Sequence, residues 1–396
     1  MIVQSSVAEA NTDTNSDLPQ PDLPEQDALN IVQTLAKRLR ALNGDGYEHA
    51  DYTVPIGWEE RVGHLNDEPI RRLIIFLRST GCEWVKKTGG CTMCGFYCAT
   101  AHGAQVSAED YVSQFEYVQD AVDLHDYPVI SLYNDGNIFN ESEMPQSAVD
   151  RICSIIDGYK NIKKVVVESR IDYSPEENVI RMKKKLGGRQ LEVAFGFESA
   201  DPQVMNLCIN KGFSSHNFDA FFSRMQRNEI VAKPLLLVKP PFLTESESIS
   251  DVLKTIGYLS SRGLNYVDLE VTTVERNTVV HELWNNSLYR PPWLWSVIEI
   301  LKRSRELYGD RAHVYVSPWT YSVESLDGPR NCGLCDADVA KRIQEYNYQF
   351  DLSVFDGLDC SCRDHEWKAA MDETDPRKIP ERIRDMIGKT AAPVLS

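Results

Sequence analysis

The chain has 396 residues, 42% of them hydrophobic and 26% charged, a composition typical of a globular protein with one large domain and a small appendage. Its formal net charge of −17 argues against a surface that is complementary to nucleic acid as a whole. No apolar run approaches the roughly 20 residues that a membrane helix needs. The first residues also lack a basic-then-apolar signal, so we expect a cytoplasmic protein without a membrane partner.

The N-terminal 70 residues divide into two parts. Residues 1–26 are polar, dotted with proline and poor in aromatic side chains, which predicts a disordered arm. Residues 27–70 form an accessory segment that begins with DALNIVQTLAKRLRALN, where apolar residues recur at helical spacing. Asp27 stands where the N-cap of this helix is expected.

Between residues 71 and 327 short apolar strands alternate with helices. The predicted strands are 71–77, 127–134, 162–169, 190–199, 229–241, 264–273 and 312–318. Strands that are apolar along nearly their whole length and alternate with helices indicate a parallel sheet. Six or seven such units, most of them ending in polar residues, predict an α/β fold with a partial (β/α)6-type TIM barrel. In such a barrel the carboxyl ends of the strands carry the chemistry.

The stretch GCEWVKKTGGCTMCGFYC, residues 81–98, holds four cysteines in one glycine-rich loop directly after the first strand of this series. Clustered cysteines in a cytoplasmic protein bind metal more often than they form disulfides. A zinc knuckle would normally place a dozen or more residues between two cysteine pairs, which this loop does not. Thiolates suit iron–sulfur clusters, and three thiolates leave one iron of a four-iron cluster open for another ligand.

The loop resembles the cluster loop of the radical S-adenosylmethionine (SAM) superfamily, in the long-spaced variant of elongator-type and archaeosine-forming enzymes. The resemblance implies a [4Fe–4S] cluster with SAM on its open iron, a cofactor pair that the barrel positions and shields. The ligands that it implies are Cys82, Cys91 and Cys94, with Phe96 and Tyr97 beside the cluster. Cys98 lies outside the pattern, and we expect it to be a small buried side chain, because a fourth thiolate would block SAM.

Further segments are similar to the archaeosine-forming radical SAM lyase family. They are INKGFS (209–214), VKPPFLTESESISDV (238–252), VERNTVVHELWNNSLYRPPWLWSVIEILKR (274–303) and the tail motifs NCGLC and DCSC. Together they cover about residues 70–367 and occur in the expected order. The chain departs from the family at NDGNIFN (134–140), where the family has a Ser-Gly-Ser-Phe-Leu-Asp-like segment. It departs again at ESRID (168–172), where a proline usually follows the arginine. Both segments should face SAM or the substrate.

The resemblance also implies roles for polar residues at the strand ends. Expected SAM contacts are Asn134, Asp135, Gly136, Glu168, Ser169, Arg170, Glu198 and Lys239. An arginine can hold the SAM carboxylate bidentately and a glutamate can accept both ribose hydroxyls. Substrate candidates are Asn210, Lys211, Glu270, Thr272, Glu275 and Arg276. The alternative is that strand-end polar residues only cap loops.

The last segment, residues 328–396, reads as a small cysteine-rich C-terminal lobe. Cys332, Cys335, Cys360 and Cys362 give the spacing C-x2-C-x24-C-x-C. Four thiolates from two short elements form a closed tetrahedral site, which fits structural zinc. An auxiliary iron–sulfur cluster on the same four ligands is the alternative.

The resemblance implies a radical SAM enzyme that abstracts a hydrogen atom, with an electron supplied by a reductant such as flavodoxin or ferredoxin. The archaeosine-forming relatives split a carbon–nitrogen bond in a lysine adduct on a deazaguanine base in tRNA, so we expect C–N or C–C bond cleavage or rearrangement of such an adduct. The acidic charge and the altered NDGNIFN segment favour a small-molecule substrate, with tRNA as the other candidate. The alternatives are radical sulfur insertion or methylthiolation with an auxiliary cluster, and a non-catalytic iron–sulfur protein that binds a partner.

Overall fold

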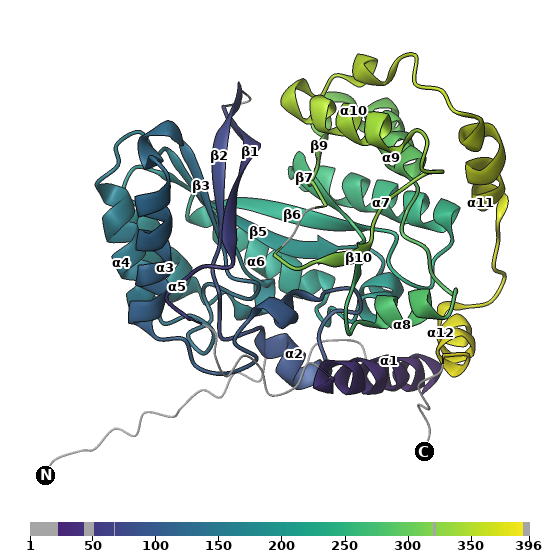
Figure 1. The fold of residues 1–396 in the computed structure, drawn as a ribbon, viewed down its shortest axis with the longest axis horizontal. Helices are drawn as coiled ribbons and strands as arrows, with labels where there is room; N and C mark the ends of the chain where they lie inside the picture. Colours follow the sequence, from purple (N-terminus) through teal and green to yellow (C-terminus); the bar gives the residue numbers. More distant parts are fainter. Residues whose placement is uncertain (1–22, 43–50, 67, 320–321, 391–396) are drawn as a thin grey trace, which may run out of the picture.

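The computed structural model describes residues 23–42, 51–66, 68–319 and 322–390, so most of the predicted disordered arm lies outside the described residues. Eight strands form one curled sheet in the order β1-β2-β3-β4-β5-β6-β7-β9, parallel from β2 onward (Figure 1). The strands are β1 (Gly57–Leu65), β2 (Glu68–Phe76), β3 (Val129–Tyr133), β4 (Lys164–Glu168), β5 (Gln190–Glu198), β6 (Val231–Val238), β7 (Tyr266–Val271) and β9 (His313–Val316). The seven predicted strands and the partial barrel are therefore confirmed.

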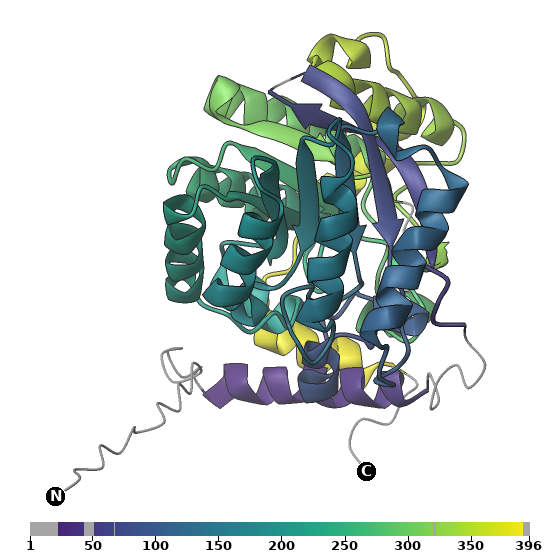
Figure 2. The same cartoon turned by 90° about the vertical axis from the view of Figure 1, so that its left-hand side faces the viewer.

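Helices cover the outside of the curled sheet (Figures 1 and 2). They are α3 (Ala108–Ala121), α4 (Gln146–Asp157), α5 (Glu176–Lys185), α6 (Ser215–Arg227), α7 (Glu245–Ser260) and α9 (Leu294–Tyr308). Three of them begin at a capping box, with Ser107, Ser214 or Thr244 as the N-cap, which satisfies backbone N–H groups that the first turn leaves unpaired. Their apolar faces and the outward side chains of the strands form the main core.

Further elements lie around the rim of the barrel and in the tail. They are α2 (Glu83–Thr88), α8 (Val279–Asn285), α10 (Asp336–Gln349), α11 (Lys368–Asp372), α12 (Ile379–Gly388) and a two-stranded sheet of β8 (Val274–Glu275) and β10 (Ser325–Asp327). Within the described part of the chain, no helix is both long and apolar enough to span a bilayer.

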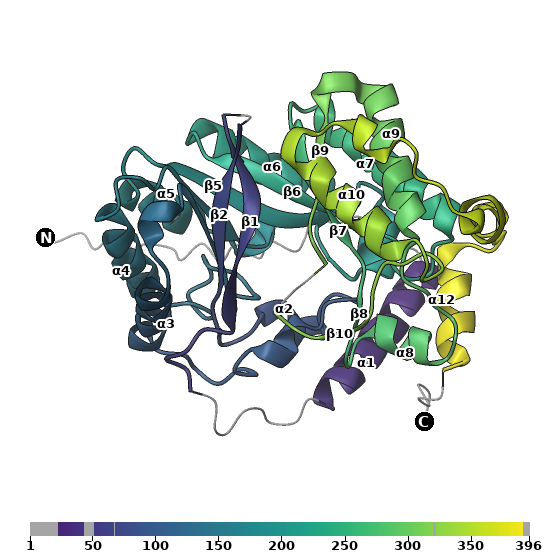
Figure 3. The same ribbon diagram turned by 45° about the horizontal axis from the view of Figure 1, so that its top comes forward.

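Strand β1 is an element that the sequence reading missed within the segment 27–70. It pairs antiparallel with β2, and Asn66 takes a φ of 52° at the tight turn between them. The hairpin leans toward the opposite edge of the sheet, as Figure 3 also shows. There the Tyr315 hydroxyl donates to the Val62 carbonyl at 3.5 Å, and the His64 ring stacks on Phe350 with 4.9 Å between centroids. The hairpin therefore helps to close the open side of the half-barrel.

Paired charges line a second cavity in the amino-terminal half of the barrel. Lys233 pairs with Asp268 at 2.8 Å, and Lys164 pairs with Glu192 at 3.0 Å. Burial opposes ionisation of Glu192, but Lys233 and Lys164 outweigh it and lower the pKa of Glu192 to about 2. Arg72 donates to the Ser131 hydroxyl at 2.9 Å and lines both this cavity and the cavity at the carboxyl rim, so its side chain lies between the two.

The two ends of the described chain meet outside the carboxyl rim, on the side of the cysteine loop. Helix α1 (Leu23–Ala41) packs against α12, and Val32 and Leu35 share a core with Ile383 and Ile387 (Figure 1). The expected N-cap at Asp27 is wrong, because the helix begins four residues earlier with a proline in its first turn. The tail does not stand apart from the barrel, since buried side chains of α10 belong to the main core.

Candidate active site at the carboxyl rim of the barrel

A cavity of about 220 Å³ opens at the carboxyl ends of the parallel strands. The structure brings most of the residues predicted for the site into its wall. These are Cys82, Cys91, Cys94, Phe96, Tyr97, Asp135, Gly136, Glu168, Ser169, Arg170, Glu198, Lys211, Glu270, Thr272 and Glu275. Other wall residues, among them Trp84, Met93, Tyr133 and Ser322, were not singled out from the sequence. One space thus collects cysteines, aromatic rings and charges of both signs.

Four predicted site residues lie outside this wall. Asn134 is fully buried, and its side-chain amide has no hydrogen-bond partner among the described residues. Lys239 pairs with Glu245 at 2.6 Å beside α7. Arg276 is exposed. Asn210 is buried and holds the cysteine loop, because its amide donates to the Gly90 carbonyl at 2.8 Å.

The three motif cysteines come from one tightly wound loop. Cys82 precedes helix α2, and Gly89 and Gly90 follow it with φ of 89° and 84°, which only glycine adopts readily. A side chain at Gly89 would stand 2.6 Å from the backbone nitrogen of Lys37 in α1. The loop therefore depends on its glycines to turn back against α1.

The spacing of the motif thiols fits a multi-iron cluster better than a single ion. Among the described residues, the four tail cysteines are the only group of His, Cys, Asp or Glu ligand atoms that all lie within 4.8 Å of one another. The motif cysteines thus stand further apart than the ligands of one ion, although all three line the same cavity. Burial raises the pKa of the Cys82 thiol to about 12 and that of Cys94 well above its usual range, so both need a bound metal to become thiolates.

Hydrogen bonds connect the NDGNIFN segment to the cysteine loop and to the residues after β4. The Asn137 amide donates weakly to the Cys82 sulfur at 3.8 Å, and its oxygen accepts the backbone N–H of Arg170 at 2.7 Å. Glu143 is fully buried and accepts backbone N–H groups from Glu83 at 2.9 Å and from Asn137 at 2.6 Å. Sequence reasoning missed Asn137 and Glu143, and the only signal was the density of polar residues between β3 and α4.

Two buried cations face the cavity from its wall. Lys211 Nζ lies 2.8 Å from Glu198 Oε1, with both side chains less than a tenth exposed. Arg170 pairs with Asp172 at 2.8 Å and stacks over the Trp84 ring at 4.3 Å. Its Nη1 is buried and has no hydrogen-bond partner among the described residues. The wall thus contains a buried N–H group that lacks an acceptor among the described residues.

A pair of carboxyl groups, Asp135 buried and Glu168 partly buried, lies across the ends of β3 and β4. Glu168 Oε1 accepts the backbone N–H groups of Asn134 and Asp135, both at 2.8 Å, and an oxygen of Asp135 accepts from the Ser322 hydroxyl at 2.7 Å. Burial raises the pKa of Asp135 to about 7. Burial and the charge of Asp135 raise that of Glu168 to about 8. A cationic ligand would stabilise the ionised pair.

Three strand ends at this rim carry left-handed residues other than glycine. Asp135 follows β3 with a φ of 52°, Glu198 ends β5 with 66°, and Lys239 follows β6 with 59°. Such strained backbone clusters at functional sites, where it aims side chains that a regular strand would direct elsewhere. The strain thus coincides with the rim that carries the cavity.

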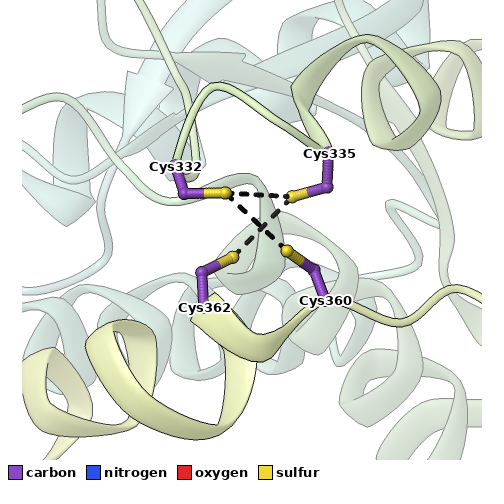
Figure 4. A group of neighbouring side chains, drawn as sticks. All are labelled: Cys332, Cys335, Cys360 and Cys362. Atoms are coloured by element: carbon purple, nitrogen blue, oxygen red, sulfur yellow. Dashed lines mark hydrogen bonds between the residues drawn. The ribbon is translucent and has the colours of Figure 1, made fainter.

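The four tail cysteines form a second candidate metal centre, separate from the rim. In Figure 4 their side chains converge from the NCGLC loop and from the start of the helical turn after Asp359. The sulfurs of Cys332 and Cys360 lie 3.7 Å apart, as do those of Cys335 and Cys362. Trp295 in α9 donates its indole N–H to the Cys362 sulfur at 3.2 Å. The group can therefore hold a metal, as the cysteine spacing predicted.

Comparison with known proteins confirms the resemblance to the archaeosine-forming proteins. The chain is homologous to archaeosine synthase subunit beta of Methanosarcina acetivorans, with 29% identity over 313 residues that cover 78% of this chain and 88% of that protein. The same subunit of Thermococcus kodakarensis is 27% identical over 304 residues, covering 75% of this chain and 91% of that one. No protein-family model matches the chain.

Solved structures show a more distant likeness. The archaeal Elp3 of Methanocaldococcus infernus matches with a TM-score of 0.44 and 15% identity over 63% of this chain and 59% of that one. Methylornithine synthase matches with a TM-score of 0.43 and 10% identity over 87% of this chain and 92% of that one. At these scores the likeness bears on neither activity nor substrate.

Proposed function

We propose that this chain is a radical SAM enzyme that breaks a carbon–nitrogen bond in an amino-acid-derived adduct, with a [4Fe–4S] cluster on Cys82, Cys91 and Cys94. The observation that carries the proposal is that these widely spaced thiols share one cavity with charged residues from several strand ends. Homology to archaeosine synthase subunit beta over most of that subunit's length supports the class of adduct.

When bound, the cluster and SAM supply a deoxyadenosyl radical that removes a hydrogen atom from the substrate. The contribution of the chain is to bind, orient and shield. Asn137 and Glu143 fix the NDGNIFN segment against the cysteine loop, and the aromatic wall of Phe96, Tyr97 and Trp84 limits the access of water.

The charged wall matches the polar groups of SAM. Arg170, with its unpaired Nη1, and Lys211 are suited to the SAM carboxylate. Glu198 is suited to the ribose hydroxyls, and Asp135 with the adjacent Gly136 to the SAM ammonium group. These assignments place the anion-binding and cation-binding groups on different strand ends, so that SAM is held in one orientation.

The substrate we propose is a lysine-type adduct of a deazaguanine base. Its amino group is cationic, and the cavity wall holds more carboxyl groups than SAM requires. Glu168 and Glu270 are both partly buried at the strand ends, and this burial raises the pKa of each. Bringing an ammonium group between them would stabilise their ionised forms.

The base could be free or part of tRNA, and we propose tRNA as its carrier. The relatives are named subunits of archaeosine synthase, so a second chain that supplies the RNA-binding surface would reconcile a tRNA substrate with a net charge of −17. The acidic surface of this chain alone would then bind tRNA weakly.

Sulfur insertion requires an auxiliary cluster, and the tail site argues against one. Sulfurs around a tetrahedral zinc at about 2.3 Å lie roughly 3.8 Å from one another. The measured separations of 3.7 Å for Cys332–Cys360, 3.7 Å for Cys335–Cys362 and 4.0 Å for Cys332–Cys335 match that spacing. We therefore propose a structural zinc in the tail.

The experiment that tests the function is anaerobic incubation of the reconstituted protein with SAM, dithionite and the adduct, either as the free base or within tRNA. We expect deoxyadenosine together with a cleaved adduct, and faster turnover of the tRNA form when the partner subunit is added. Absence of deoxyadenosine and methionine from protein with an intact cluster would contradict the enzyme proposal. Turnover of the free base alone would contradict the tRNA proposal.

A further inference from the structure

Arg40 lies near the end of helix α1 and is 8% exposed, although it belongs to the N-terminal segment rather than to the barrel. Its Nε donates to the Gly89 carbonyl at 3.0 Å. Its Nη2 donates to the carbonyl of Cys91 at 3.4 Å and to that of Cys94. One guanidinium group therefore holds three carbonyls of the cysteine loop, two of them in the proposed cluster ligands.

The loop and the helix are fitted to each other around this contact. Gly89 lies against the backbone of Ala36 and Lys37, where any side chain would collide. On the neighbouring turn of α1 the Gln33 amide donates to the Asn210 oxygen at 2.9 Å, and Asn210 in turn donates to the Gly90 carbonyl. Helix α1 thus reaches the loop both directly and through Asn210.

Arg40 also brings a positive charge that the protein leaves partly unsatisfied. Its Nη1 is buried and has no hydrogen-bond partner among the described residues. Its charge acts on Cys94 and on Glu275, which accepts the Gly95 backbone N–H on the far side of the loop. Burying a cation without full pairing is costly, so a negative group beside it would be stabilised.

A four-iron cluster on three thiolates is such a group. It carries a net negative charge, and reduction by one electron makes that charge larger. A fixed buried cation stabilises the more negative form and thereby raises the reduction potential. We propose that Arg40 is a positioning residue that fixes Cys91 and Cys94 through their carbonyls and raises the reduction potential of the cluster. This inference rests on the proposed function.

The test uses full-length variants reconstituted anaerobically with iron and sulfide. Arg40→Met removes the charge, Arg40→Lys keeps the charge but loses the planar fork, and Arg38→Met removes an exposed charge from the same helix as a control. Iron content and the midpoint potential from an EPR-monitored redox titration are measured. We expect a more negative midpoint for Arg40→Met, a smaller shift for Arg40→Lys and the wild-type midpoint for Arg38→Met.

A wild-type midpoint in iron-loaded Arg40→Met, or an equal shift in Arg38→Met, would overturn the proposal. If Arg40→Met binds no iron, the unfolding temperatures of the iron-free proteins show whether the variant has lost only the loop contacts or the stability of the whole fold. An unchanged unfolding temperature with lost iron supports a specific hold on the loop, whereas a lowered one in both Arg40 variants overturns the proposal. Wild-type protein that binds no four-iron cluster would instead contradict the proposed function.

Discussion

Lys211 and Glu198 form a buried ion pair at the carboxyl end of β5, with 2.8 Å between Nζ and Oε1. The pair exists because Gly196, two residues before Glu198, has no side chain. A Cβ on Gly196 would overlap both Glu198 Oε1 and Lys211 Nζ. The shape of the cavity wall that we propose for SAM binding is therefore set partly by the absence of a side chain at Gly196.

Gly196→Ala should displace this ion pair and weaken SAM binding while leaving the sheet intact. Gly196 lies in β5 beside a register shift in the pairing with β6, but its φ is outside the left-handed region, so alanine fits the backbone and only the space for the pair is lost. We expect the Kd for SAM, measured by equilibrium dialysis on reconstituted protein, to rise about tenfold, the equivalent of about 1.4 kcal/mol. Gly188→Ala is the control, because nothing lies within 4 Å of its added Cβ. Equal affinities for the two variants would contradict the role of the pair.

Single alanine variants of the cysteine loop should distinguish the proposed cluster ligands from Cys98, which we expect not to bind the cluster. Cys82→Ala, Cys91→Ala and Cys94→Ala should each lose most of the bound iron and the SAM-cleavage activity, because each removes one cluster ligand. Cys98→Ala should keep both, since the Cys98 sulfur contacts the Arg276 carbonyl at 3.9 Å and does not line the cavity. Iron analysis and deoxyadenosine assays measure the outcome. Loss of iron from Cys98→Ala would overturn the assignment.

The barrel and many residues of its rim could be predicted from the sequence, because both depend on the local pattern of apolar and polar residues. Continuous apolar strands identify a parallel sheet, and the carboxyl ends of such strands must meet at one edge. Glu168 and Glu198 could thus be placed together before their contacts were known. Lys239 also follows a strand end, but its side chain pairs with Glu245 in α7. Asn210 follows the helical turn Val204–Cys208 and donates to the Gly90 carbonyl of the cysteine loop. A sequence pattern does not show which partner such a side chain meets.

The features that sequence reasoning missed depend on distant contacts. Strand β1 lies at the edge of the sheet and holds three consecutive charged residues, Glu59, Glu60 and Arg61, so it lacks the apolar run that marked the other strands. Arg40 is one of several basic residues in an amphipathic helix, and only the fold brings it to the cysteine loop, more than forty positions away. Glu143 likewise gains its role from backbone groups that the fold supplies.

The carboxyl pair predicts a pH dependence for the iron-free protein. The pKa values of Asp135 and Glu168, about 7 and about 8, lie above the ordinary values of 3.8 and 4.5. The folded state therefore binds protons more tightly than the unfolded chain at these groups. Their contribution to the free energy of unfolding is most favourable below about pH 4 and is lost as pH rises toward about 8.

Asp135→Asn tests this dependence, since asparagine tolerates the left-handed backbone and cannot ionise. Between about pH 6 and about pH 8.5, we expect the unfolding temperature of the iron-free variant to fall less than that of the wild type, measured by circular dichroism. If the unfolding temperatures of the two proteins changed with pH in the same way, the pair of Asp135 and Glu168 would not titrate in this range.

The tail cysteines should bind one zinc that stabilises the fold without taking part in the chemistry. Sulfur separations of 3.7 to 4.0 Å leave room for one ion at their centre, and Asn331 and Trp295 donate N–H groups to two of the sulfurs at 3.3 and 3.2 Å. Elemental analysis of reconstituted protein should give about four irons and one zinc per chain. Cys332→Ser should lose the zinc, keep the iron and unfold at a lower temperature. About eight irons per chain, with no zinc, would contradict the zinc proposal and restore sulfur insertion as the better function, because the tail would then hold the auxiliary cluster that this chemistry requires.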